Sequence, residues 1–185
     1  MKNIILVVVS FFGLCVLVFL MYLIHLGVMA KVQVVESNVG PYTMVYKEEK
    51  AVYSMVRELQ LRMAEAIKNE DQVEVRKRFG MFTQDPAKSI KAPMECKIGC
   101  ILEEADKETI AKLEKKYKIM QFPETNSLTV VFPYQDMTSF VVGAVKVYPE
   151  FEKYAQQKGY KISAPLEILD TRLRKIFYSM RIEKK

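Results

Sequence analysis

Tryptophan is absent from the 185 residues, histidine occurs once and cysteine three times. A single histidine and three cysteines are too few for a zinc site with the usual ligand spacing or for a disulfide framework. Glycine and proline, with seven each, are too few for a collagen-like or low-complexity chain. Neither a Gly-x-Ser-x-Gly motif nor a glycine-rich phosphate loop is present. We therefore expect no metal and no cofactor, and the sequence carries no standard hydrolase or nucleotide-binding signature.

Charged residues are missing from the run between Ile4 and Ala30. As a helix these 27 residues would be about 40 Å long, enough to cross a hydrocarbon core of about 30 Å. We expect residues 1–30 to be the N-terminal transmembrane anchor of a single-pass membrane protein. The alternative is a cleavable signal peptide with Lys2 as its basic start and 28–30 as its cleavage site, although the apolar core of such peptides usually has about 7–15 residues. Basic residues at the two ends differ by one charge, which leaves the side of the remaining domain open.

The charge balance is basic, with 28 Lys and Arg against 22 Asp and Glu, but the basic residues are dispersed. Local clusters occur at 76–78 and 112–118, and we interpret both as solvated surfaces. Their attraction to anionic lipid head groups would be about 1 kcal/mol per basic residue close to a bilayer. No helix-turn-helix pattern precedes the domain and no basic residues alternate with aromatic ones, so the expected partners include a lipid bilayer but no nucleic acid.

The rest of the chain divides into a short linker and one domain. We expect residues 31–40, which end in Gly40-Pro41, to be the linker and residues 41–185 to form the domain. The hydrophobic periodicity predicts strands at 42–46, 79–82, 94–102, 128–132, 165–169 and 174–182, and helices at 52–67, 107–117 and 137–158. Asp106 is expected to cap the second helix, and Gly159 to end the third. Pro149 predicts a kink in the third helix or a division into two.

The predicted elements repeat in the order strand, helix, strand, strand. Residues 42–46 lie 86 positions before 128–132, and the same offset places Phe82 on Ile168. Neither βαββ half could bury both its helix and its sheet face alone. We therefore expect an α+β domain in which the two halves share an antiparallel sheet with helices on one face. The cleft between the halves is where a ligand would bind.

Several ordered runs carry a resemblance to a known family. They are Met44-Val45-Tyr46-Lys47, Cys96-Lys97-Ile98-Gly99-Cys100-Ile101-Leu102, Thr129-Val130-Val131-Phe132-Pro133-Tyr134, Val147-Tyr148-Pro149, Gly159-Tyr160 and Ala164-Pro165-Leu166-Glu167-Ile168. Over about residues 41–183 the chain resembles the GyrI-like domain, an SHS2-type fold that also serves as the effector-binding domain of multidrug-responsive transcription factors. Within that family it is most similar to the membrane-anchored branch that includes the testis-expressed receptor for selective autophagy of the endoplasmic reticulum.

The resemblance implies a binding acid at Glu167, with Leu169 standing where the family usually has an aromatic residue. Alternation along the strand puts Glu167 and Leu169 on one face and their neighbours on the other. In a cleft rimmed by Tyr46, Phe82 or Tyr134, the carboxylate would supply the counter-charge for a small cationic or amphipathic molecule. The bland alternative is a solvent-exposed Glu167, or one paired with a base such as Arg172 or Arg174.

Three functions remain open from the sequence. The first is a membrane-tethered module that binds a small molecule, and the second is a membrane-anchored adaptor that recruits an unknown protein. The recruitment motif of the autophagy receptor is not transferred, because its bare pattern occurs only in the expected strand at 42–46. The third, less favoured, is a hydrolase with Glu167 as general acid or base and Tyr46 or Tyr134 orienting a water. Cys96 and Cys100 are interpreted as small buried hydrophobes.

Overall fold

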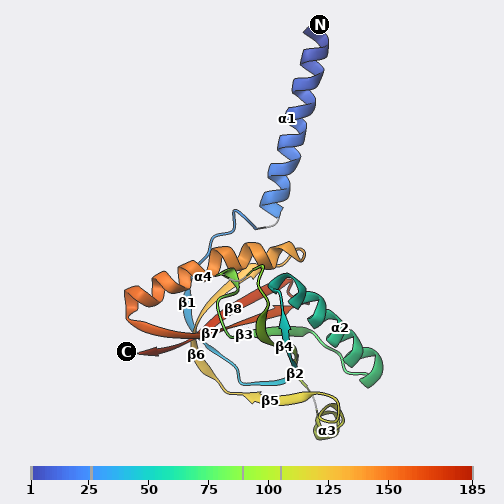
Figure 1. The fold of residues 1–185 in the computed structure, drawn as a ribbon, viewed down its shortest axis with the longest axis vertical. Helices are drawn as coiled ribbons and strands as arrows, with labels where there is room; N and C mark the ends of the chain where they lie inside the picture. The colour runs from blue at the N-terminus through green and yellow to red at the C-terminus, as the bar shows by residue number, and fades with distance from the viewer. Residues whose placement is uncertain (1, 26, 89, 105, 185) are drawn as a thin grey trace.

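A computed structural model of the chain describes residues 2–25, 27–88, 90–104 and 106–184. The helices are α1 (Lys2–His25), α2 (Tyr53–Asp71), α3 (Lys107–Leu113) and α4 (Thr138–Lys158), with a 3-10 turn at Pro86–Lys88. The strands are β1 (Val35–Val39), β2 (Tyr42–Ala51), β3 (Lys77–Phe82), β4 (Met94–Leu102), β5 (Lys118–Phe122), β6 (Thr125–Pro133), β7 (Tyr160–Asp170) and β8 (Lys175–Lys184). This is the expected α+β architecture, preceded by one apolar helix that projects away from the domain (Figure 1).

The strands form one antiparallel sheet in the order β1-β6-β8-β7-β3-β4-β2-β5. Each predicted half contributes three consecutive strands, β2, β4 and β3 from the first half and β6, β8 and β7 from the second. The two halves meet where β3 pairs with β7, and there Gly80 lies opposite Glu167. The internal duplication of element order is therefore confirmed.

The expected offset of 86 residues between the halves is wrong. Phe82 belongs to the core on the helix side of the sheet, whereas Ile168 belongs to the cluster on the opposite side. A one-residue slip moves every side chain of a strand to the other face. An offset of 87 keeps both faces: it relates Val45 to Phe132 and Gly80 to Glu167, which all face the helices.

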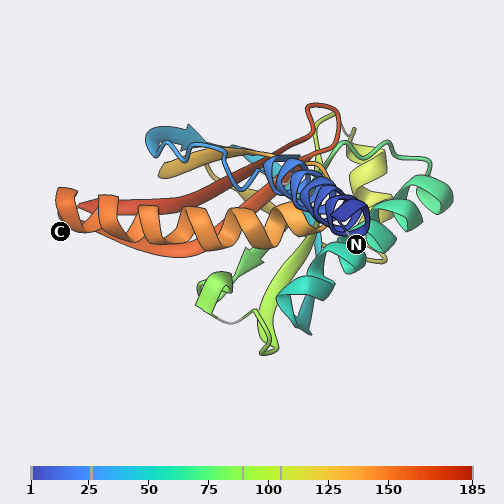
Figure 2. The ribbon, with the colours of Figure 1, turned by 90° about the horizontal axis from the view of Figure 1, so that it is seen from above.

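The two faces of the sheet are covered differently. Helices α2 and α4 pack on one face, where Tyr53, Phe140 and Phe151 join the alternate side chains of β6 and β8 in the largest core cluster. Helix α4 lies crosswise between the sheet and the end of α1 (Figures 1 and 2). The opposite face carries a cluster of strand side chains alone, among them Phe79 and Ile168. The site described below lies on the helix side.

The helix ends follow the expected local chemistry. Asp106 caps α3, because its Oδ1 accepts a hydrogen bond of 2.7 Å from the backbone N–H of Thr109. Gly159 ends α4 with φ at 69°, a left-handed conformation that favours glycine. Helix α3 ends at Leu113 rather than at Tyr117. Helix α4 is a single helix with Pro149 inside it, so the expected division into two does not occur.

Two strands arise where none was expected, and both lie at the edges of the sheet. Within the segment interpreted as a linker, β1 pairs with β6 from Val35↔Thr129 to Val39↔Thr125. At the other edge, β5 pairs with β2. Three of the five side chains of β1 are polar and four are exposed, so hydrophobic periodicity could not reveal it. An edge strand needs only one neighbour and can be held by backbone hydrogen bonds.

The segment between α1 and β1 is attached to the domain. The Nζ of Lys146 on α4 donates hydrogen bonds to the carbonyl oxygens of Val28 and Ala30, at 2.5 and 2.6 Å. Within α1, Ile4–His25 is a 22-residue helix long and apolar enough to cross a membrane, and a signal sequence near the N-terminus can meet the same criterion.

Candidate functional site: a buried carboxylate under three tyrosines

Glu167 lies in the middle of β7 and points toward the helices. Its neighbours Leu166 and Ile168 belong to the cluster on the opposite face, so the predicted alternation is confirmed. The side chain is buried, with 1% of the residue surface exposed. Its partners across the two adjacent strands are Gly80 on β3 and Tyr178 on β8. Glu167 is thus at the centre of the sheet, where the two halves join.

Tyrosine hydroxyl groups surround the carboxylate. The Oη of Tyr53, from the first turn of α2, lies 2.8 and 3.0 Å from the two carboxylate oxygens. The Oη of Tyr148, from α4, donates to Oε1 of Glu167 at 2.5 Å. Tyr178 on β8 donates instead to the backbone carbonyl of Phe140 at 3.1 Å, and its ring packs edge-on against Tyr148. Two phenols, from α2 and α4, therefore bind the single acid, and the ring of the third packs against Tyr148.

A glycine on α4 makes room for this cluster. A Cβ atom at Gly143 would lie 2.2 Å from the Tyr178 hydroxyl oxygen, well inside the sum of van der Waals radii. The absence of a side chain at Gly143 is what lets the Tyr178 hydroxyl reach the Phe140 carbonyl.

Burial sets the ionisation of the site. Loss of water around the charged form raises the pKa of Glu167 from 4.5 to about 7, although hydrogen bonds from Tyr148 and Tyr53 favour the charged form. Burial also raises the pKa values of the three tyrosines well above 10. Among the described residues, no Lys or Arg lies within the 4.0 Å of an ion pair with Glu167. The carboxyl group is therefore held by neutral phenols.

Arg57 is a second buried ionisable group nearby. It projects from α2, is 4% exposed, and its guanidinium carbon lies 3.2 Å from the centre of the Phe140 ring. It donates a hydrogen bond from Nη1 to Oε1 of Gln60, while its Nε has no partner. Burial and the like charge of Arg78 lower the pKa of Arg57 to about 9. Arg57 therefore stays positively charged at neutral pH.

Two of the expected aromatic residues lie close to this cluster. Phe82 packs edge-on against Tyr53 with ring centres 5.5 Å apart, and Tyr134 is tilted against Phe140 at 5.5 Å. Tyr46 is not brought together with Glu167. It lies on the opposite face of the sheet, with the amino group of Lys97 5.2 Å above its ring.

The alternative of a solvent-exposed or arginine-paired Glu167 does not describe this structure. Glu167 is neither exposed nor paired with Arg172 or Arg174, since its oxygens lie on tyrosine hydroxyls and Arg174 donates to Gln135. The carboxyl group is held inside the protein instead.

Sequence reasoning missed Tyr53, Tyr148, Tyr178 and Arg57. Tyr148 was within reach, because it stands in one of the runs that carry the family resemblance. Arg57 also left a signal: with Tyr53 and Gln60 it lies on the apolar stripe of α2, at spacings of four and three. Polar residues inside such a stripe are either paired in the core or functional.

Aromatic side chains fill the space expected to be a cleft. A surface hollow of about 610 Å³ is lined by 48–50, 81–83, 95–97 and Ala164, and not by Glu167 or the three tyrosines. Phe82 is shared, because it lines this hollow and also packs on Tyr53. Met81 and Lys97, which also line the hollow, project from the face of the sheet opposite Glu167.

The two cysteines of β4 keep their thiols protonated at neutral pH. Cys96 and Cys100 are buried, and burial raises the pKa of their thiols to about 11 and about 12. Across the part of the chain that the structure describes, no group of three or more His, Cys, Asp or Glu side chains could hold a metal ion.

Comparisons with known proteins identify the fold. No family model and no curated protein matches the sequence. Solved structures do match. The C-terminal domain of EcmrR has a TM-score of 0.59 and 14% identity, over 83% of this chain and 99% of that one. A hydrolase encoded by lin2189 from Listeria innocua has a TM-score of 0.50 and 11% identity, over 82% of this chain and 92% of that one. SAV2435, solved with bound tetraphenylphosphonium, has a TM-score of 0.50 and 11% identity, over 83% of this chain and 94% of that one.

These matches cover nearly the whole of each solved chain but share few residues with this one. At such identity they identify the architecture and assign no chemistry. The domain that follows α1 therefore has the GyrI-like α+β fold of these structures.

Proposed function

We propose that this chain is a membrane-tethered binding module for a small lipophilic cation, with Glu167 as the counter-charge. The observation that carries the proposal is the isolation of the carboxyl group: it is 1% exposed and held only by tyrosine hydroxyls. A buried acid without a basic partner is costly to ionise, and an incoming cation would remove that cost.

The surroundings of Glu167 suit a large organic cation better than a metal ion. Tyr53, Tyr148, Phe82 and Tyr178 present aromatic rings on the helix side of the sheet, and such rings attract cations by about 0.5–2 kcal/mol each. A metal ion would need several more anionic or imidazole ligands. Binding requires the aromatic side chains to move apart, and Phe82 would have to move with Tyr53 because the two rings pack edge-on. The tetraphenylphosphonium held by SAV2435 is a cation of this class.

The tether is the second part of the proposal. Helix α1 is exposed over residues 4–22 and apolar enough to span a bilayer, which supports an uncleaved anchor. The hydrogen bonds from Lys146 to Val28 and Ala30 hold the chain leaving α1 against α4, the helix that also carries Tyr148. The domain would then lie next to the bilayer, where lipophilic molecules are concentrated.

The test is tetraphenylphosphonium binding to the full chain in phosphatidylcholine nanodiscs, with empty nanodiscs as the baseline. Calorimetry is expected to show saturable binding that weakens by about tenfold or more in Glu167→Gln. Glu108→Gln is the matched control, because Glu108 is exposed on α3 and should bind like wild type. Equal binding by wild type and Glu167→Gln would exclude Glu167 as the counter-charge.

Hydrolysis is the second candidate function. A carboxyl group with a pKa of about 7 suits general acid or base catalysis at neutral pH, and one similar structure is described as a hydrolase. Turnover of activated esters or strained rings that disappears in Glu167→Gln would favour this function over simple binding. Activity equal to wild type in that variant would remove it.

A further inference from the structure

Two buried arginines on the helix side of the sheet lack anionic partners. Arg57 on α2 is 4% exposed and Arg78 on β3 is 9% exposed. The Nε atoms of both are buried without a hydrogen-bond partner. No carboxylate of the described segments lies within 4.0 Å of either guanidinium group. Buried polar groups are nearly always paired, so two unpaired guanidinium donors call for an explanation.

The two arginines belong to one place in the fold. Burial lowers the pKa values of both arginines, and the like charge of Arg78 further lowers the pKa of Arg57. Tyr134 is tilted against the Phe140 ring that carries Arg57, and Arg78 lies two residues before Gly80, which is covered by the Gln60 side chain that Arg57 binds. Tyr134 is half-buried and Arg78 sits at the limit of burial, so this side of the cluster reaches toward solvent.

This place adjoins Glu167 without neutralising it. Arg57 is joined to Gln60, and the Gln60 amide nitrogen lies over Gly80, where a Cβ would be only 2.9 Å from it. Gly80 is in turn the strand partner of Glu167. Glu65, exposed on α2, acts on Arg78 from beyond ion-pair distance. Glu167 and Glu65 therefore act electrostatically on the two arginines, but neither acid forms an ion pair with a guanidinium group.

We propose that Arg57 and Arg78 form an anion subsite beside Glu167, so that the ligand carries a phosphate or phosphonate group as well as an apolar body. The fork of a guanidinium group matches the oxygens of a phosphate, and two arginines match its charge of about −2. The Phe140 ring under Arg57 and the Tyr134 ring beside it supply the apolar contact. The inference rests on the proposed binding function and adds a second charge requirement to it.

The test uses three probes that share a fluorophenyl ring: 4-fluorophenylphosphonate, 4-fluorobenzyl alcohol and 4-fluorobenzyltrimethylammonium. Binding to the full chain in phosphatidylcholine nanodiscs is measured by ligand-observed fluorine NMR, with empty nanodiscs as the baseline. The phosphonate is expected to bind about tenfold or more tightly than the alcohol, and to lose that advantage in Arg78→Gln and Arg57→Gln. Arg76→Gln is the matched control, since Arg76 is exposed and paired with Glu74.

The ammonium probe separates this inference from the proposed function. Arginine variants that still bind the ammonium probe are folded, and in them loss of phosphonate binding supports the anion subsite. Glu167→Gln should lose the ammonium probe and keep the phosphonate. The subsite is overturned if the phosphonate binds no better than the alcohol, or if Arg78→Gln binds it like wild type. If only the ammonium probe fails in wild type, the cation site is wrong and the anion subsite stands.

Should Arg57→Gln fail to fold, Arg78→Gln decides, because Arg78 is nearer the surface and does not pack on Phe140. Arg57→Lys gives a further reading, since it keeps the charge but removes the fork. Weaker phosphonate binding in this variant supports bidentate recognition.

Discussion

Glu167 owes its properties to the water it loses on folding. In the unfolded chain its carboxyl group is hydrated and titrates near 4.5, whereas in the folded protein its pKa is about 7. Two tyrosine hydroxyls replace part of the lost hydration and hold the carboxylate in one orientation. At neutral pH the carboxyl group is therefore close to its pKa, and the proposed ligand cation would take the place of the proton.

The stability of the protein should fall as the pH rises from about 4.5 to about 7. Over this range the folded state keeps a proton on Glu167 that the unfolded state has released. The loss is on the order of 3 kcal/mol, since each pKa unit corresponds to about 1.4 kcal/mol. Urea unfolding of the fragment that begins at Lys31, which keeps every strand, measures it across this pH range.

Glu167→Gln is the control for this dependence, because glutamine keeps the shape of the side chain and cannot titrate. The difference in unfolding free energy between the two proteins should grow with pH in favour of the glutamine variant. A difference that is constant from pH 4.5 to pH 8 would contradict the raised pKa of Glu167.

The sequence predicted some of these residues and not others, for physical reasons. Strand alternation was enough to place Glu167 on the face opposite Leu166. Alternation alone does not say which face the helices cover. Tyr46 was therefore expected to rim the cleft around Glu167, although it lies on the opposite face of the sheet. Arg57 could not be assigned a role from its type, because an arginine on a helix is usually solvated and only packing against Phe140 makes it buried.

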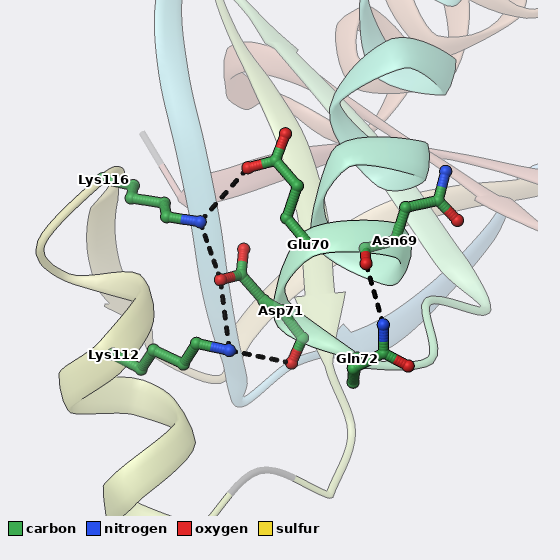
Figure 3. Close-up of polar contacts among 6 residues, drawn as sticks. All are labelled: Asn69, Glu70, Asp71, Gln72, Lys112 and Lys116. Atoms are coloured by element: carbon green, nitrogen blue, oxygen red, sulfur yellow. Dashed lines mark hydrogen bonds and ion pairs between the residues drawn. The ribbon is translucent and has the colours of Figure 1, made fainter.

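At the scale of elements, ion pairs join the end of α2 to α3 (Figure 3). Asp71 is the last residue of α2, and its side chain is fully covered. Its Oδ1 lies 2.9 Å from Nζ of Lys116 and 3.4 Å from Nζ of Lys112, which also donates to the Asp71 carbonyl. The hydrogen bond from Lys116 lowers the pKa of Asp71 below 3.8. The cluster adds to the packing of Leu113 and Ile110, which attach the short helix α3 to the core.

Asp71→Asn should loosen this junction. The change removes a charge-assisted contact to two lysines, and we expect a loss of about 1 kcal/mol in the free energy of unfolding at neutral pH. A lowered pKa means that the contribution is present above about pH 4 and disappears below it, so the variant and wild type should converge in acid.

The control is Glu70→Gln, which touches the same Lys116 through an exposed pair of 3.2 Å and should change stability little. Chemical denaturation at pH 7 and at pH 3 gives both comparisons. Equal destabilisation by Asp71→Asn and Glu70→Gln would mean that the buried carboxylate of Asp71 contributes no more to stability than the exposed one of Glu70.

The elements that the sequence predicted are those with strong periodicity. The apolar stripes of α2 and α4 identified both long helices, and the caps at Asp106 and Gly159 marked two helix ends. The edge strands β1 and β5 were missed because they depend on a neighbour rather than on their own pattern. Pro149 did not divide α4, since its packing on the core holds the helix together on both sides of the proline.

For the whole molecule, the duplication explains where the site lies. With the offset of 87, Gly80 and Glu167 are equivalent positions of the two halves, and they face each other at the junction. One half therefore contributes a glycine, whose missing side chain leaves room for Gln60, and the other half contributes the acid. A symmetric pair of glutamates at this point would place two like charges in contact inside the core. The asymmetry is thus a requirement of burying a carboxyl group on the axis of the duplication.

Helix α4 connects this junction to the segment that follows α1. It carries Tyr148 on its inner side, and its Lys146 binds the carbonyl oxygens of Val28 and Ala30. Lys146→Met keeps the aliphatic stem and removes the hydrogen bonds. We expect amide hydrogen exchange over residues 28–34 of the full chain to quicken by about tenfold, while the melting temperature of the domain changes little.

Lys153→Met tests whether a charge lost anywhere on α4 has the same effect. Lys153 is on the same helix, exposed, and paired only loosely with Glu150 at 3.8 Å. Exchange over residues 28–34 should be unchanged in this variant. If Lys146→Met also leaves it unchanged, the segment after α1 is not held by Lys146, and the domain would be free to turn relative to α1. If exchange quickens only in Lys146→Met, the orientation of the binding site relative to α1 depends on one lysine of the helix that carries Tyr148.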